Sequence, residues 1–279
     1  MKDLSNENVI HIVKDGVQYL QFRRLLEYSD ILVHAYSLGI DKNFRTARAK
    51  NAEPITKEEF KESNKDYADL CNAIEMNYID AVKPNQAHTK NVKKVDERVN
   101  INKPDFNLKE YDLTDGLITN KSNILLATTN ADCILLMFFD PVKKAIANVH
   151  SGWKGTLQRI SVETVEKMRK EYGSNSKDII CCICPSIRKC HFEVEKDVQT
   201  LFENEFKDLK LDEIIERKSE NKWLIDTVKI NEEILQKAGL KKENIIDCGI
   251  CSVCNSDLIH SYRVEKEKYG LSTAIIGLK

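Results

Sequence analysis

The chain has 279 residues, and its 43 basic and 44 acidic side chains give a formal net charge of −1. This balance argues against a general nucleic-acid binder, and no apolar run approaches the length of a membrane span, so we expect a soluble, cytoplasmic protein. Nine cysteines in a chain without an export signal are expected to be reduced thiols, and the absence of linkers or repeats predicts a single domain over residues 1–279.

The predicted elements include a run of strands in quick succession that marks the core of the fold, with helices before and after it. Apolar runs bounded by turn residues predict strands at 30–37, 78–82, 115–120, 123–129, 133–139, 145–150, 178–184, 245–250 and 274–276. Helical spacing predicts helices at 56–74 behind a capping box, at 157–172, at 198–206 and at 226–238. The polar segment 91–109 predicts a surface strand or loop. His34, inside the first strand, is interpreted as a core or edge histidine rather than a ligand.

The segment from Asn130 to Gly155 has the clearest chemistry. Its two predicted strands are joined by a turn at Asp140-Pro141, so they are expected to pair in antiparallel fashion and to bring Cys133 close to His150. The glycine-containing turn that follows leads into a helix, where backbone N–H groups can meet an anion. Taken singly, Cys133 and His150 are each better interpreted as buried core residues, because free cysteine is among the most buried residue types.

His88 extends this pattern, because it follows the predicted strand at 78–82. Two imidazoles and a thiolate around one ion leave a fourth tetrahedral position open, as in a catalytic zinc site. The alternative for His88 is a solvated loop histidine. Arg263 has a guanidinium group that suits an anion, with a surface charge as its alternative interpretation.

The remaining cysteines raise the question of a second metal site. A site built from Cys181, Cys184, Cys190 and His191 is disfavoured, because Cys181 and Cys184 are an odd number of residues apart on a predicted strand and point to opposite faces. For Cys248, Cys251 and Cys254, packing plus a loop is favoured over a metal cluster.

Seven motifs occur in the order found in the laccase-domain family, also called multicopper polyphenol oxidase-like, whose members are described as purine nucleoside phosphorylases. The chain resembles this family from about Ile31 to Ile276. The motifs are Gln86-Ala87-His88, Asp115-Gly116-Leu117-Ile118-Thr119, Ala131-Asp132-Cys133, His150-Ser151-Gly152-Trp153-Lys154-Gly155-Thr156-Leu157, Cys184-Pro185-Ser186-Ile187, Glu193-Val194 and Ser261-Tyr262-Arg263.

The resemblance implies an α+β, single-domain layered fold of mixed β-sheets flanked by helices (α/β/β/α-like), with zinc bound by His88, Cys133 and His150. It implies phosphorolysis of adenosine, inosine, guanosine and S-methyl-5'-thioadenosine, and deamination of adenosine to inosine. Purine nucleosides and inorganic phosphate are then the expected partners, with Lys154 and Arg263 placed around the phosphate.

Two alternatives stay open beside this interpretation. A copper-dependent polyphenol oxidase needs several copper ions, for which six scattered histidines are few. A non-catalytic zinc-binding interaction protein is suggested by two departures from the family pattern. Gly39 and Leu271 stand where the family commonly has arginine, and these missing cations put the phosphate site in question. The preferred nucleoside and the oligomeric state do not follow from the sequence.

Overall fold

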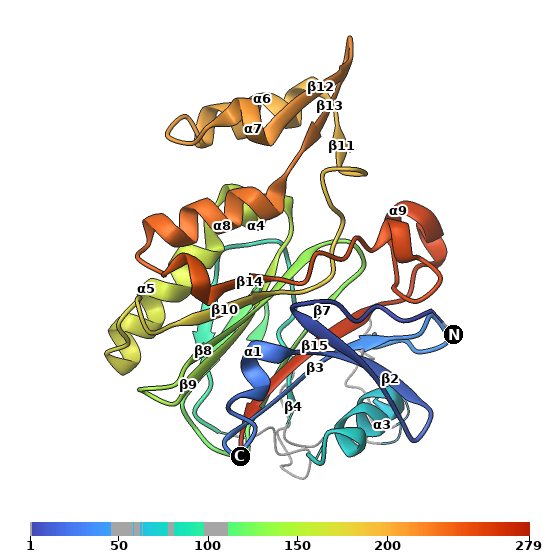
Figure 1. The fold of residues 1–279 in the computed structure, drawn as a ribbon, viewed down its shortest axis with the longest axis vertical. Coiled ribbons are helices and arrows are strands. Elements are labelled where there is room, and N and C mark those ends of the chain that lie inside the picture. Colours follow the sequence, from blue (N-terminus) through green and yellow to red (C-terminus); the bar gives the residue numbers. More distant parts are fainter. Residues whose placement is uncertain (1, 46–57, 59–61, 63, 78–80, 98–110) are drawn as a thin grey trace.

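Two six-stranded mixed sheets form the centre of the computed structural model, which describes residues 2–45, 58, 62, 64–77, 81–97 and 111–279 (Figure 1). In spatial order, the first sheet contains β1 (Val9–Lys14), β2 (Val17–Phe22), β3 (Leu32–Leu38), β15 (Ser272–Leu278), β7 (Leu125–Asn130) and β4 (Ala81–Val82). The second contains β14 (Ile245–Asp247), β10 (Ile180–Ile183), β8 (Ile134–Asp140), β9 (Ala145–Ser151), β6 (Gly116–Thr119) and β5 (Val92–Lys94).

Helices cover the outer faces of both sheets. Helix α3 (Lys65–Ala73) packs on the first sheet, while α5 (Ile160–Tyr172) and α8 (Thr227–Lys237) pack on the second. The inner faces share one apolar core. The expected layered α+β fold of mixed sheets and helices is therefore confirmed, whereas the single-domain boundary at 1–279 stays a prediction.

Strand β8 explains why its segment is an unbroken apolar run. Leu135, Met137 and Phe139 point into the core between the sheets, whereas Leu136 and Phe138 point to the layer beneath α5 and α8. Because both faces of this strand are buried, no alternation of polar and apolar residues is needed. Its predicted antiparallel pairing with β9 is confirmed.

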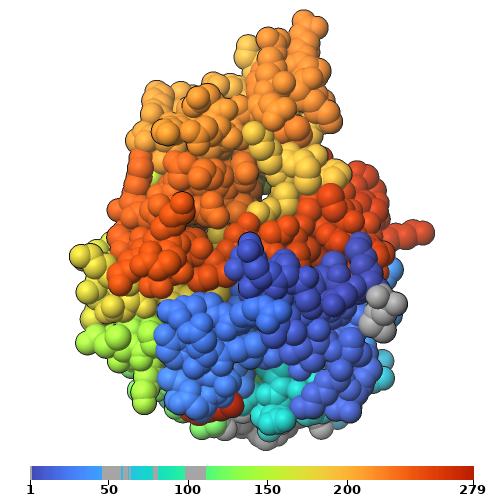
Figure 2. Space-filling view, in the orientation of Figure 1, coloured from blue at the N-terminus to red at the C-terminus, as the bar shows by residue number. Residues whose placement is uncertain are grey.

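A third layer was not predicted. The short strands β11 (Glu193–Val194), β13 (Lys222–Ile225) and β12 (Ile215–Ser219) form a small sheet with α6 (Lys196–Glu205) and α7 (Leu211–Ile214). This layer has its own apolar cluster around Phe202 and Phe206, and it stands above the rest of the molecule in Figures 1 and 2. Trp153 and Leu157 pack against that cluster.

The helix predicted at 157–172 is interrupted near its start, so its prediction as one continuous helix was wrong. The chain forms α4 (Trp153–Leu157) and then α5, with Arg159 at φ 56° between them, in the left-handed region that breaks a helix. Other end signals are confirmed: Gly173 closes α5 at φ 66°, and the Asp226 carboxylate accepts the Lys229 N–H to cap α8.

Several predictions fall partly outside the described residues. These are the capping box at Thr56, the start of the strand at 78–82, and most of the polar segment 91–109. The short helices α1 (Arg23–Leu26) and α9 (Tyr262–Glu265) complete the elements used below. No helix within the described ranges is long and apolar enough to cross a membrane.

His34 is a core residue, as predicted, and it makes stability depend on pH. It is 1% exposed, its Nε2 accepts the Phe22 N–H at 2.7 Å, and burial lowers its pKa to about 3. Below a pH of about 6.5, His34 is protonated in the unfolded chain but stays neutral in the folded chain. Its contribution to the free energy of unfolding should therefore fall by about 1.4 kcal/mol for each unit by which the pH decreases. His34→Gln should remove this contribution.

Urea denaturation of both proteins between pH 7 and pH 4 measures the effect. The difference in unfolding free energy between wild type and variant should shrink as the pH falls. A difference that is constant over this range would show that His34 does not titrate in this way.

Candidate metal centre

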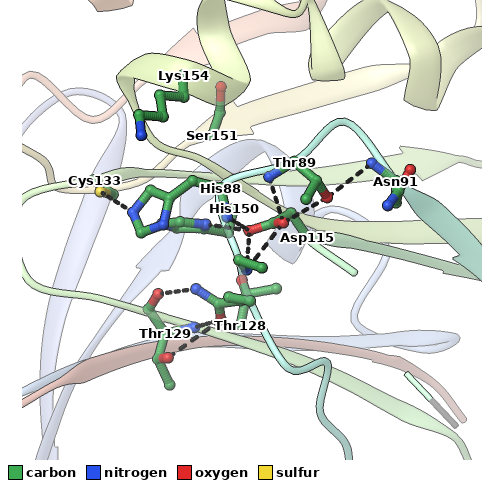
Figure 3. Close-up of polar contacts among 12 residues, drawn as sticks. His88, Thr89, Asn91, Asp115, Thr128, Thr129, Cys133, His150, Ser151 and Lys154 are labelled. Atoms are coloured by element: carbon green, nitrogen blue, oxygen red, sulfur yellow. Dashed lines mark hydrogen bonds and ion pairs between the residues drawn. The ribbon is translucent and has the colours of Figure 1, made fainter. Parts of the chain in front are cut away.

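The structure brings His88, Cys133 and His150 together (Figure 3). His88 lies in the loop after β4, Cys133 directly precedes β8, and His150 lies in β9, opposite Leu135 in the strand register. Their ligand atoms all lie within 4.8 Å of one another, and His88 Nε2 is 3.9 Å from Cys133 Sγ. The register thus produces the predicted proximity of Cys133 and His150; a metal bound there stays a prediction.

Asp115 is a buried residue that holds two of the three candidate ligands in place. Its fully buried carboxylate accepts hydrogen bonds from His150 Nδ1 at 2.8 Å, from the backbone amides of Ala87, His88 and Thr89, and from the Thr89 hydroxyl. Burial alone would raise the pKa of this carboxyl, but these hydrogen bonds outweigh it and hold the pKa at about 2. One carboxylate therefore positions both the His88 loop and the His150 ring.

Asp115 belongs to one of the family motifs, but its role in supporting the centre was not predicted from the sequence. The available signal was an acidic residue directly before a strand whose residues are all apolar or small, because a charge in that place needs several partners.

The contact with Asp115 also sets the protonation of His150. With Nδ1 donating to the carboxylate, Nε2 is left to face the open centre, an orientation common in metal-binding histidines. Burial disfavours charge on His150, but the nearby Cys133 sulfur and Asp115 raise its pKa to about 9. Burial likewise disfavours the thiolate of Cys133, but the two imidazoles lower its pKa to about 6. The site therefore favours a thiolate, the form of cysteine that binds metals.

Gly152 leaves the space that the ligands occupy. A Cβ atom at this position would lie 2.7 Å from His88 Cδ2 and 3.2 Å from Cys133 Sγ. The backbone at Gly152 is extended with φ −62°, so the glycine is needed for close approach and not for an unusual conformation.

Side-chain clamps hold the loops on either side of the centre. Gln86 donates to the Thr129 carbonyl at 2.7 Å and accepts the Thr129 N–H at 2.8 Å, which ties the His88 loop to the end of β7. His88 and Asp132 have positive φ angles of 59° and 85°. Non-glycine residues adopt this region at a cost that the surrounding hydrogen bonds offset.

Lys154 and Arg263 differ in how they relate to the centre. Lys154 is exposed in the first turn of α4, above His88 and Cys133 in Figure 3, and its Nζ lies 5.4 Å from the centre of the Trp153 ring. Arg263 instead donates from its guanidinium group to the carbonyl oxygens of His191 and Glu193, and from its N–H to Asp132. That either residue binds phosphate stays a prediction.

Gly39 and Leu271 lie at the same end of the first sheet as the Cys133 loop. Gly39 directly follows β3, Leu271 directly precedes β15, and β15 begins with Ser272 paired to Asn130. The two positions without arginine therefore lie at the sheet end from which the Cys133 loop leaves. Close to Leu271, the Arg45 guanidinium lies 4.7 Å from the centre of the Tyr269 ring.

A second cluster corrects the interpretation of the remaining cysteines. Cys190, His191, Cys251 and Cys254 have ligand atoms within 4.8 Å of one another. For Cys251 and Cys254, packing plus a loop is therefore an incomplete description, because a Cys-His pair from a distant part of the chain lies beside them. Cys248 is buried in the core, and Cys181 and Cys184 lie on opposite faces of the second sheet, as predicted.

Two imidazoles and one thiolate with a free fourth direction are the ligand set of a mononuclear catalytic metal centre. The chain belongs to the family described as multi-copper polyphenol oxidoreductase laccase, which matches residues 47–279. The expected family is thereby confirmed.

The chain is also similar to named purine nucleoside phosphorylases. The chain is 32% identical over 221 residues to the purine nucleoside phosphorylase YlmD of Bacillus subtilis strain 168, covering 77% of this chain and 76% of that protein. It is 31% identical over 175 residues to the human purine nucleoside phosphorylase LACC1, covering 61% of this chain and 40% of the human protein.

Solved structures support the fold alone. A Bacillus licheniformis hypothetical protein, YfiH, superposes with a TM-score of 0.78 at 24% identity and covers 96% of this chain and 99% of its own. YlmD from Geobacillus stearothermophilus superposes with a TM-score of 0.77 at 19% identity and covers 100% of both chains.

Proposed function

We propose that this chain is a zinc-dependent purine nucleoside phosphorylase that also deaminates adenosine to inosine. The observation that carries the proposal is the open set of His88, Cys133 and His150 backed by Asp115. Membership of a family whose relatives are named purine nucleoside phosphorylases supports it. The proposed nucleoside substrates are adenosine, inosine, guanosine and S-methyl-5'-thioadenosine, and inorganic phosphate is the co-substrate of phosphorolysis.

The ligand set suits zinc. In tetrahedral zinc coordination, a sulfur and a nitrogen ligand lie about 3.6 Å apart. His88 Nε2 and Cys133 Sγ are 3.9 Å apart, so a small adjustment on binding suffices. A multicopper oxidase needs further imidazoles around further ions. Of the other histidines, His34 is buried in the core and His260 is bonded to Glu265 and the Lys42 carbonyl.

Each proposed role of the protein side chains follows from its position. When bound, zinc would lower the pKa of water toward ~7 and polarise a substrate oxygen or nitrogen. His150 would give up its Nε2 proton to bind a metal, while the Asp115 carboxylate holds the other proton on Nδ1. His88 is exposed, as is Lys154 above it, so the nucleoside and phosphate would approach from their side.

In phosphorolysis, a phosphate oxygen forms a bond to C1' of the ribose while the bond from C1' to the purine nitrogen breaks. The products are ribose 1-phosphate and the free purine, which takes up a proton. The Lys154 ammonium group would bind the phosphate and reduce its repulsion from the Cys133 thiolate. In deamination, water adds at C6 of adenine and ammonia leaves. Only phosphorolysis uses phosphate, so a change at Lys154 should affect phosphorolysis and not deamination.

The test incubates zinc-loaded protein with adenosine, with and without phosphate, and resolves adenine, inosine and hypoxanthine. Cys133→Ala should reduce both reactions by about 100-fold or more, because a metal ligand is lost. Lys154→Met should raise the KM for phosphate by about 10-fold to 100-fold, as expected for one charge-assisted hydrogen bond, and leave deamination unchanged. Lys170→Met, which neutralises a lysine on α5, serves as the control.

Two results of this experiment would contradict the proposed function. Absence of conversion by zinc-loaded protein, or undiminished conversion by Cys133→Ala, would remove the proposal. Copper in the purified protein together with oxygen consumption on phenols would favour the oxidase instead.

A further inference from the structure

A second group of metal-ligating side chains lies where the chain leaves the second sheet for the third layer. Cys190 and His191 lie three and two residues before β11 of the small sheet, and Cys251 and Cys254 follow β14. Cys190 Sγ lies 3.6 Å from Cys251 Sγ and 4.0 Å from Cys254 Sγ. His191 Nδ1 lies 3.1, 3.7 and 3.6 Å from the sulfur atoms of Cys190, Cys251 and Cys254.

We propose that Cys190, His191, Cys251 and Cys254 bind a structural zinc ion with all four tetrahedral positions filled by protein. Zinc bonds of about 2.3 Å to sulfur and about 2.0 Å to nitrogen place sulfur atoms about 3.8 Å apart and sulfur and nitrogen about 3.6 Å apart. The observed separations scatter around these values. A disulfide between Cys190 and Cys251 would need the sulfur atoms at about 2.05 Å, so the observed spacing suits a shared ion better.

The backbone already holds the two halves of the site beside each other. Ser186 forms a parallel bridge with Cys251, and the Ser252 N–H donates to the Ser186 carbonyl at 2.9 Å. The Asn255 side chain donates to the Cys251 carbonyl at 2.8 Å, which shapes the loop between Cys251 and Cys254. Little chain ordering would therefore be needed when the ion binds.

The charge around the site is compatible with three thiolates. Three thiolates and Zn²⁺ leave a net charge of −1, and the Arg263 guanidinium donates to the His191 carbonyl at 2.9 Å. This cation lies beside the cluster and partly offsets that charge. Thiolate-rich sets also favour zinc over hard cations such as Mg²⁺.

The second site is linked to the first through Asp132. The Ser252 hydroxyl donates to one oxygen of the Asp132 carboxylate at 2.6 Å, and the Arg263 N–H donates to the other at 2.7 Å. Asp132 directly precedes Cys133, so an ion at Cys251 and Cys254 would stabilise the loop that carries a ligand of the first site. The proposal itself requires no catalytic activity.

Metal analysis of the full chain, produced with zinc and kept reduced, tests the proposal. We expect two zinc ions per chain in the wild type and one in each of Cys254→Ser and Cys133→Ala. Cys248→Ala, a cysteine in the same segment that lies outside the cluster, should retain two. Cys254→Ser should also lower the thermal midpoint by about 5 to 10 °C. One zinc in the wild type that survives in Cys254→Ser and disappears in Cys133→Ala would overturn the proposal.

A second measurement uses the wild type alone, in case a variant fails to fold. Cys190 and Cys254 are exposed, so iodoacetamide at alkaline pH should reach and label both in a protein without metal. Bound zinc should suppress this labelling at least about 10-fold until a chelator is added. Equal labelling with and without the chelator, or a Cys190–Cys251 disulfide in the zinc-supplemented protein, would overturn the proposal.

Discussion

Asp115→Asn should lower the free energy of unfolding by about 3 to 5 kcal/mol, as expected when one partner of a buried ionic network is removed. The carboxylate accepts from three consecutive backbone amides, a hydroxyl and the His150 ring. An amide NH₂ in place of one oxygen would face these donors without accepting from them. Zinc affinity at the first site should fall by about 10-fold to 100-fold, the usual effect of losing such a supporting group.

Asp112→Asn is the matched control. It neutralises a carboxylate three residues earlier that bonds to the Asn85 side chain, and it contacts none of the three ligands. Urea denaturation and a competitive zinc titration should show a change below about 1 kcal/mol for this variant. Equal behaviour of the two variants would show that Asp115 does not organise the centre.

Gly152→Ala should damage metal binding with little change elsewhere in the fold. The new methyl group would lie 2.7 Å from His88 Cδ2 and 3.2 Å from Cys133 Sγ, so both side chains must move. Metal–ligand distances tolerate only about 0.2 Å, so zinc affinity should fall by about 100-fold or more. Overpacking of this kind costs about 1 to 3 kcal/mol of stability.

Gly155→Ala provides the comparison within the same turn. A Cβ atom there meets Ile160, the His150 carbonyl and the Thr89 carbonyl at 3.4, 3.6 and 3.6 Å, which are ordinary contacts. In helix α4 alanine is favoured over glycine by about 1 kcal/mol, so this variant should keep its zinc and be equally or more stable. If both variants lose zinc alike, the crowding argument fails.

Local patterns predicted those parts of the fold that depend on neighbouring residues. The run at 133–139 predicted β8, and its short turn predicted the antiparallel pairing that places Cys133 near His150. The break at Arg159 was not predictable, because arginine carries no preference for a left-handed conformation. The small third sheet was also missed, since β12 is largely polar, β11 has only two residues, and the pairing of its strands is set by tertiary contacts.

The sites show the same limit. His88 joined the candidate centre only through its place after a strand and the family motifs, because it is far from Cys133 in the sequence. For the second cluster, reasoning on strand faces correctly separated Cys181 from Cys184. It could not bring Cys190 to Cys251, since that contact depends on the parallel pairing of β10 with β14 and on the bridge at Ser186.

Strand β15 has a consequence for the order in which the molecule matures. It lies between β3 and β7, and the Thr273 N–H donates to Ser37 across 236 residues of chain. Its first residue pairs with Asn130, whose side chain donates to the Cys133 carbonyl. Contacts between such distant segments form slowly, so the Cys133 loop should reach its final position late in folding. The first site would then bind its ion only after most of the fold has formed, so binding of this ion would not nucleate folding.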